Sequence, residues 1–157
     1  MFYNCKSLLT PPILPNKGVV YGRCYSWMFA GCTSLTAAPE ISGTWAVNEC
    51  CRGMFEGCTN LVKAPSILPE YELSYGCYWN MFTNCKSLKT PPILAQPSAI
   101  QRYCYANMFR GCTSLTAAPN IPLTSLADQC CQNMFVNCTS LSTAPELPIT
   151  TLSPYCY

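Results

Sequence analysis

The sequence predicts an α/β repeat solenoid of six units, each containing one short strand, a loop and a helix. Three observations predict this fold. A Met-Phe pair recurs along the whole chain, an asparagine or glycine stands at a fixed place after it, and a proline follows at a fixed place after the next leucine. Self-similarity at a period of about 20 to 50 residues is typical of stacked units that bury an apolar face against their neighbours.

The Met-Phe pairs define the units. They lie 26 or 27 residues apart, at Met1-Phe2, Met28-Phe29, Met54-Phe55, Met81-Phe82, Met108-Phe109 and Met134-Phe135. The units are therefore 1-27, 28-53, 54-80, 81-107, 108-133 and 134-157. A longer period of 80 residues lies above them, since Asn4 to Leu8 returns as Asn84 to Leu88. We expect one repeat array over 1-157, built from a duplicated block of three units.

Each unit contains a segment with helical periodicity. Leu126, Cys130 and Met134 fall at i, i+4 and i+8, which favours a helix with one broad buried face. The residue before the next cysteine is always asparagine or glycine, the types that most readily adopt the left-handed conformation closing a helix. These residues are Asn4, Gly31, Gly57, Asn84, Gly111 and Asn137. The pattern predicts six helices of about three turns.

A proline stands four places after the leucine of every unit. These prolines are Pro12, Pro39, Pro65, Pro92, Pro119 and Pro145. Because proline has no backbone N–H, any parallel ladder between units must be short or broken at this level. We expect strands of about three residues just before the prolines, and a variable loop after them.

The motif resembles a known repeat family. Met-Phe-x-x-Cys-x-Ser-Leu followed by a proline-containing strand is similar to the BspA-type leucine-rich repeats of bacterial surface proteins, and the resemblance covers all six units. It implies a leucine-rich-repeat-like solenoid at the cell surface or secreted, from a bacterium. It also implies adhesion through binding of host or cell-surface proteins or glycans.

Fourteen cysteines allow three interpretations. In a helix, Cys24 and Cys32 would lie about 12 Å apart, beyond the roughly 7 Å limit for a disulfide. No histidine and no Cys-x-x-Cys pair supports zinc. We favour buried reduced thiols that fill two core positions per unit as small apolar residues, and rank disulfides second and metal last. Cys51 and Cys131 replace a tyrosine found in other units.

The composition argues against catalysis and several classes of partner. Without histidine, a Ser-His or Cys-His nucleophile is impossible, and no cofactor motif is present. A net charge of +2, with 10% charged residues and no basic run, predicts no nucleic-acid partner. No apolar stretch is long enough to span a membrane. We expect no catalytic residue, no metal site and no cofactor.

The candidate contact residues form two groups. Lys6, Thr33, Lys86 and Thr113 belong to a polar row two places before the leucine, which either contacts a ligand or bonds the backbone of the turn. Trp45, Tyr71, Tyr75 and Tyr103 lie in the variable loops, where repeat scaffolds carry specificity, and they either contact a partner or shield the ends of the helices.

Both ends of the chain cut the same predicted helix, and neither has a polar cap. Either the chain is a piece of a longer array, or its ends meet between copies. In the second case Met1, Phe2, Tyr155 and Tyr157 are candidates for head-to-tail contact, and a filament is the alternative to adhesion.

Overall fold

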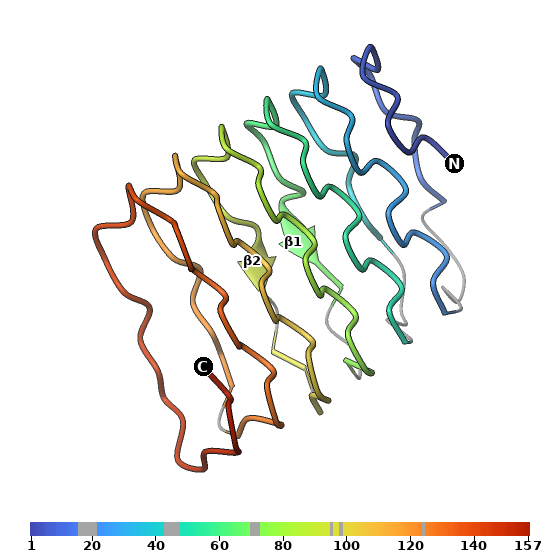
Figure 1. Cartoon of the computed structure of the whole chain (residues 1–157). Helices are drawn as coiled ribbons and strands as arrows, with labels where there is room; N and C mark the ends of the chain where they lie inside the picture. Colours follow the sequence, from blue (N-terminus) through green and yellow to red (C-terminus); the bar gives the residue numbers. More distant parts are fainter. Residues whose placement is uncertain (16–21, 43–47, 70–72, 95, 98, 124) are drawn as a thin grey trace.

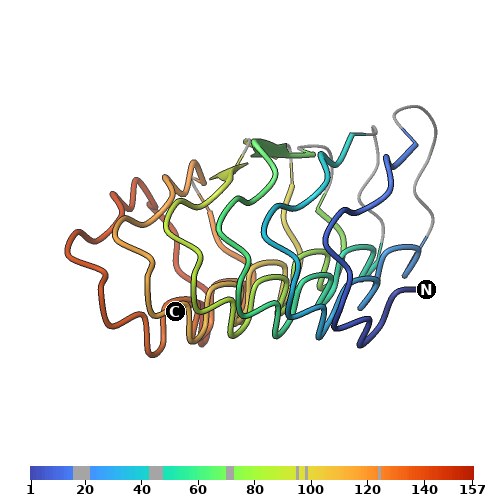
Figure 2. The same cartoon turned by 90° about the horizontal axis from the view of Figure 1, so that it is seen from above.

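The chain winds as a row of coils lying side by side, with its termini at opposite ends of the row (Figures 1 and 2). This computed structural model describes residues 1–15, 22–42, 48–69, 73–94, 96, 97, 99–123 and 125–157. Within these residues there are two strands, β1 (Ile67–Leu68) and β2 (Ile93–Leu94). They pair in parallel, with Ile67 opposite Ile93 and Leu68 opposite Leu94.

The prediction of an α/β solenoid with six helix-containing units is wrong. No residue in the described part of the chain is helical, and the segments predicted as helices are runs of turns. In one such run the N–H of Met28 donates to the carbonyl of Tyr25, and the N–H of Cys32 to that of Phe29, at 3.1 Å each. Donation to the third residue back closes a β-turn, whereas an α-helix requires the fourth.

The turns leave every second N–H free to bond the next coil. Trp27, Phe29 and Gly31 donate to carbonyls of the following coil at 2.8 to 2.9 Å. Tyr25, Trp27 and Phe29 accept in turn from the N–H groups three residues ahead of them. A helix would use all these donors internally and leave none for the neighbouring coil. The turn run thus satisfies its own backbone and joins the coils together.

The backbone repeats every four residues, which explains why the sequence suggested a helix. Positive φ angles occur at Arg23 (60°), Trp27 (50°) and Gly31 (74°), and Trp27 and Gly31 stand at the third position of a turn. Residues four apart therefore face the same way, as they nearly do at 3.6 residues per helical turn. The spacing of Leu126, Cys130 and Met134 fits either structure.

The left-handed conformation predicted at the asparagine or glycine positions is present in all six units. The φ angles run from 57° to 74° at Asn4, Gly31, Gly57, Asn84, Gly111 and Asn137. The residue choice was therefore interpreted correctly, but it forms a turn of the type II kind and not the end of a helix.

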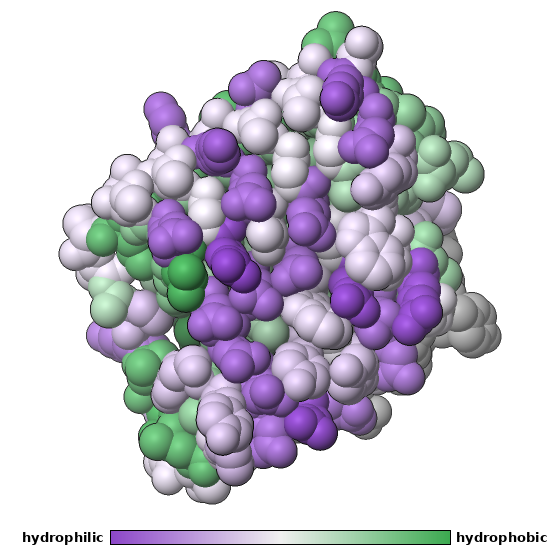
Figure 3. All heavy atoms as spheres, viewed as in Figure 1, coloured by the Kyte–Doolittle hydropathy of each residue, from purple (hydrophilic) through white to green (hydrophobic). Residues whose placement is uncertain are grey.

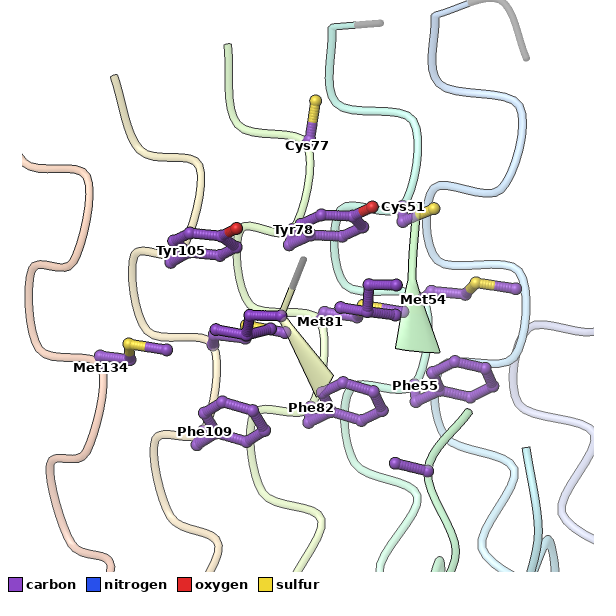
Figure 4. Packing of buried hydrophobic residues seen from close by; sticks show 14 of the residues in the cluster. Cys51, Met54, Phe55, Cys77, Tyr78, Met81, Phe82, Tyr105, Phe109 and Met134 are labelled. Carbon is purple, nitrogen blue, oxygen red and sulfur yellow. The ribbon is translucent and has the colours of Figure 1, made fainter. Parts of the chain in front are cut away.

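Columns of identical side chains fill the interior (Figure 4). The phenylalanine rings of successive coils stack nearly parallel, with centroids 5.5 to 5.9 Å apart along Phe2, Phe29, Phe55, Phe82, Phe109 and Phe135. The Tyr78 and Tyr105 rings stack similarly at 6.0 Å. Met54, Met81 and Met108 are fully enclosed between these columns. The repeat motif therefore marks the core.

Pairing near the prolines is shorter than predicted. Isolated parallel bridges join Ala37 to Lys63, Lys63 to Thr90, and Ala117 to Thr143, each two places before a proline. The two strands themselves follow Pro65 and Pro92 and have only two residues each. The missing proline N–H accounts for the break between bridge and strand.

The turn geometry can be tested at Gly57, where φ is 72° and an added Cβ would have no neighbour closer than 3.9 Å. Gly57→Asn should be nearly neutral in thermal unfolding, because asparagine occupies this position in other units. Gly57→Val should lower the unfolding free energy by about 2 kcal/mol, because a β-branched residue is strained at positive φ. Equal stability of the two variants would contradict the turn assignment.

Candidate functional site

The polar row makes hydrogen bonds between neighbouring coils. Thr113 Oγ1 donates to the carbonyl of Lys86 at 3.3 Å, and the carbonyl of Lys6 accepts from the N–H of Ser34 at 3.1 Å. Thr33 is half-buried, while Lys6 and Lys86 are exposed. These contacts fit the structural interpretation of the row, in which it joins neighbouring coils.

The loop aromatics give a clearer candidate. Trp45 and Tyr71 lie outside the described residues, but Tyr75 and Tyr103 meet edge to face with centroids 5.6 Å apart. Trp79 stacks on Tyr103, with ring centroids 5.0 Å apart and an interplanar angle of 16°. Two of the predicted aromatics therefore come together, with an indole that the sequence interpretation did not single out.

An arginine extends this cluster. The guanidinium of Arg52 lies 3.8 Å from the ring centroid of Trp79 and 4.8 Å from that of Trp27. Arg52, Trp27, Tyr75, Trp79 and Tyr103 are all partly exposed, and together we call them the aromatic–arginine patch. Cation–π contacts of this kind contribute about 0.5 to 2 kcal/mol each and hold the rings in place.

The buried carboxylate of Glu49 holds Arg52 in place. Glu49 is only 5% exposed, and its Oε1 accepts from Arg52 Nη1 at 3.1 Å. Arg23 Nε lies 2.8 Å from Oε2, although this approach lacks hydrogen-bond geometry. A charge buried this deeply requires partners, and two cations supply them. The carboxylate therefore determines where the guanidinium of Arg52 can lie.

Two polar groups of the patch lack a partner within the part of the chain that the structure describes. Two enclosed donors in it, Arg52 Nε and Trp79 Nε1, have no acceptor among the described residues. A buried polar group without a partner costs about 1 to 3 kcal/mol, and most folded proteins avoid it. Groups retained at such a cost are frequently found at functional sites.

Sequence reasoning missed most of this patch because its members stand at several different repeat positions. Trp27 stands one place before its methionine, Arg52 and Trp79 two places, and Tyr103 five places. Side chains from different columns meet only after the coils stack. The available signal was that bulky residues interrupt columns otherwise held by small or polar ones.

The cysteines form a second ordered group. No disulfide joins any of them in the described structure, and twelve are buried, while Cys5 and Cys24 are exposed. The interpretation of the core cysteines as purely apolar fillers was incomplete. The cysteines that follow the asparagine or glycine of each unit form one column, and five of its six thiols donate to a phenylalanine carbonyl of the preceding coil at 3.0 to 3.1 Å. These five are Cys32, Cys58, Cys85, Cys112 and Cys138.

Burial keeps these thiols protonated. Desolvation raises the pKa of Cys58 and of Cys112 to about 12, and it raises the pKa of Cys85 well above its usual value. Since the thiolate is the reactive form, these thiols are poor nucleophiles. Among the described residues, no group of three or more cysteines and acidic side chains is placed to hold a metal ion.

Among the residues that the structure describes, no helix has the length and apolar character needed to cross a membrane. Comparison with protein-family models, curated proteins and solved structures gives no match. The functional interpretation therefore rests on the geometry of the chain itself.

The thiol column predicts a pH dependence. The folded pKa values of Cys58 and Cys112 lie near 12 and the unfolded values near 9, so folding favours the protonated thiol. The unfolding free energy should be unaffected by these groups below about pH 9 and fall as the pH rises toward 12. Urea titrations at intervals of pH measure this. Cys112→Ala should reduce the fall, and Cys5→Ala, at an exposed site, should not.

Proposed function

We propose that the chain is a non-catalytic recognition protein that binds a protein or glycan at a cell surface through the aromatic–arginine patch. The observation that carries this proposal is the sandwich of Arg52 between Trp27 and Trp79, continued by Tyr103 and Tyr75. A bacterial surface or secreted location is proposed from the resemblance of the repeats to BspA-type sequences. We also propose that the stacked coils act as a rigid solenoid scaffold.

The composition of the patch supports this proposal. Tryptophan, tyrosine and arginine are the residues most enriched where alanine substitution costs binding energy. They supply large, partly apolar contact area with few rotatable bonds, and ring stacking with the Glu49 ion pair restricts them further. Groups already ordered before binding lose little conformational entropy when a partner arrives.

The proposal can be tested by adhesion. Fluorescent beads coated with the chain should adhere to cultured epithelial cells, and beads coated with the double variant Trp79→Ala and Tyr103→Ala should lose most of that adhesion, at least tenfold. Losing two central aromatic contacts typically costs a few kcal/mol, which is more than enough for this change. Flow cytometry of the cells measures bound beads.

The control variant is Ile93→Ser, which removes an exposed apolar side chain of β2 outside the patch and should retain adhesion. Pretreating the cells with trypsin or with glycosidases distinguishes a protein partner from a glycan. Equal adhesion by the patch variant and the unaltered chain, with thermal unfolding matched, would rule out the patch as the contact surface.

We propose head-to-tail assembly as a second candidate function, favoured by an apolar cavity at the last described coil. A cavity of about 420 Å³ opens at the last coil and is lined mainly by apolar residues, including Phe135, Val136, Leu147 and Tyr157. The N–H groups of Phe135 and Asn137 have no backbone acceptor in the described residues, unlike the equivalent groups of Phe109 and Gly111. At the first coil, Met1 is almost fully exposed and Phe2 is covered by Phe29 on one face.

The two ends are complementary in register. The N–H of Phe2 donates to the second coil, just as the N–H of Phe109 donates to the last coil. A second copy placed against the last coil could therefore continue both the hydrogen bonds and the column of phenylalanine rings. Tyr155 and Tyr157 are exposed at the last coil. Apolar residues also gather toward the ends of the row in the view of Figure 3, with polar residues between them.

Light scattering after size exclusion tests assembly. The molar mass of the chain should rise with concentration, and the double variant Val136→Lys and Leu147→Lys should remain a single chain, because two charges cannot be buried at the contact without partners. Val62→Lys, at an exposed site in the middle of the row, is the control and should still assemble. A single-chain mass for the unaltered protein at every concentration would contradict assembly.

A further inference from the structure

Two pairs of adjacent cysteines occupy equivalent places in the two halves of the chain. The Sγ atoms of Cys50 and Cys51 lie 3.6 Å apart, and those of Cys130 and Cys131 lie 3.7 Å apart. In the equivalent coils, Tyr78 and Tyr105 replace the second cysteine. The two pairs therefore place two sulfur atoms together where other coils have a single thiol beside a phenol.

The two pairs differ in their access to the surroundings. Cys51 lies within the stack, where Tyr25 bonds the carbonyl of Cys50 from one side and Cys51 itself bonds the carbonyl of Cys77 on the other. Cys131 lines the 420 Å³ cavity at the last coil, together with Met134, Phe135 and Tyr157. Only the second pair is thus shown beside an open apolar cavity.

We propose that Cys130 and Cys131 form a chelating site for a trivalent arsenical that carries an apolar substituent. Two sulfur atoms at this separation are placed to bond a single soft centre, and soft thiophilic centres prefer sulfur ligands over oxygen. The cavity beside Cys131 supplies the apolar and aromatic surface that the substituent requires. This site is separate from the aromatic–arginine patch.

The environment of the pair favours its reaction. The hydrogen bond from Cys131 favours the thiolate of Cys130 and lowers the pKa of Cys130. The same bond, together with burial, raises the pKa of Cys131. The lowered pKa of Cys130 favours the thiolate at this sulfur, and the thiolate is the nucleophilic form of a cysteine.

The reaction is a ligand exchange without oxidation or reduction. The hydrated arsenical carries its organic group and two hydroxyl groups on As(III). Two As–S bonds form and two As–OH bonds break, and the two thiol protons leave with the hydroxyl groups as two molecules of water. Arsenic remains trivalent throughout.

Phenylarsine oxide is the probe for this site. The folded chain is incubated with one equivalent in the presence of excess glutathione, which competes away adducts on single thiols, and native mass spectrometry measures the products. We expect one phenylarsenic adduct per chain, stable to glutathione and removed by 2,3-dimercaptopropanol. The unfolded chain, given several equivalents of the reagent, should take up more than one.

Tyrosine substitutions separate the two pairs without disturbing the fold, because tyrosine is the residue that other coils have at this place. Cys131→Tyr should abolish the glutathione-stable adduct, and Cys51→Tyr should leave it unchanged. Retention of the adduct in Cys131→Tyr, its loss in Cys51→Tyr, or the absence of any stable adduct on the unaltered folded chain would each overturn the proposal.

Discussion

The alternation of backbone N–H groups between turn and neighbouring coil is the constraint on which the rest of the structure depends. One N–H closes a turn within the coil and the next donates to the following coil, as Met28 and Phe29 do. This arrangement fixes the distance between coils at a value close to the roughly 4.8 Å of a β-sheet. Phenylalanine rings attached at that spacing cannot stack squarely at van der Waals distance, and they lie parallel and offset, with centroids 5.5 to 5.9 Å apart. The hydrogen bonding thus determines the packing of the core, and not the reverse.

The same constraint explains why cysteine recurs beside the phenylalanine column. The carbonyl of Phe55 accepts the N–H of Cys58 within its own coil and retains a second lone pair facing the next coil. The thiol of Cys85 reaches that lone pair from the following coil at 3.1 Å. Alanine would provide no donor there, and a larger residue would force the coils apart. A reduced thiol combines small volume with a weak donor, so the core is stabilised only while its cysteines remain unoxidised.

Sequence reasoning identified the repeat unit, the columns of core residues and the left-handed positions, because each of these depends on residue identity at a fixed place. Asn84 and Gly111 illustrate this, since only a few residue types tolerate their φ angles of 61° and 74°. The helix was wrong because a four-residue turn period and a 3.6-residue helical period place the same side chains on one face over three turns. What distinguishes them is whether the N–H of a residue such as Trp27 bonds within its coil or to the next, and no side chain reports that choice.

The contact residues were harder to predict for a related reason. Stacking identical coils produces columns, and a column of identical residues can form a core but offers the same surface at every level. Specific chemistry arises where a unit departs from its column, and the departures of neighbouring units then meet across the stack. Arg52 lies between Trp27 and Trp79 because three successive coils depart at adjacent positions. Cys130 and Cys131 adjoin because one coil has a thiol in place of a phenol. In a repeat protein of this kind, the residues that break the pattern are the ones from which function should be inferred.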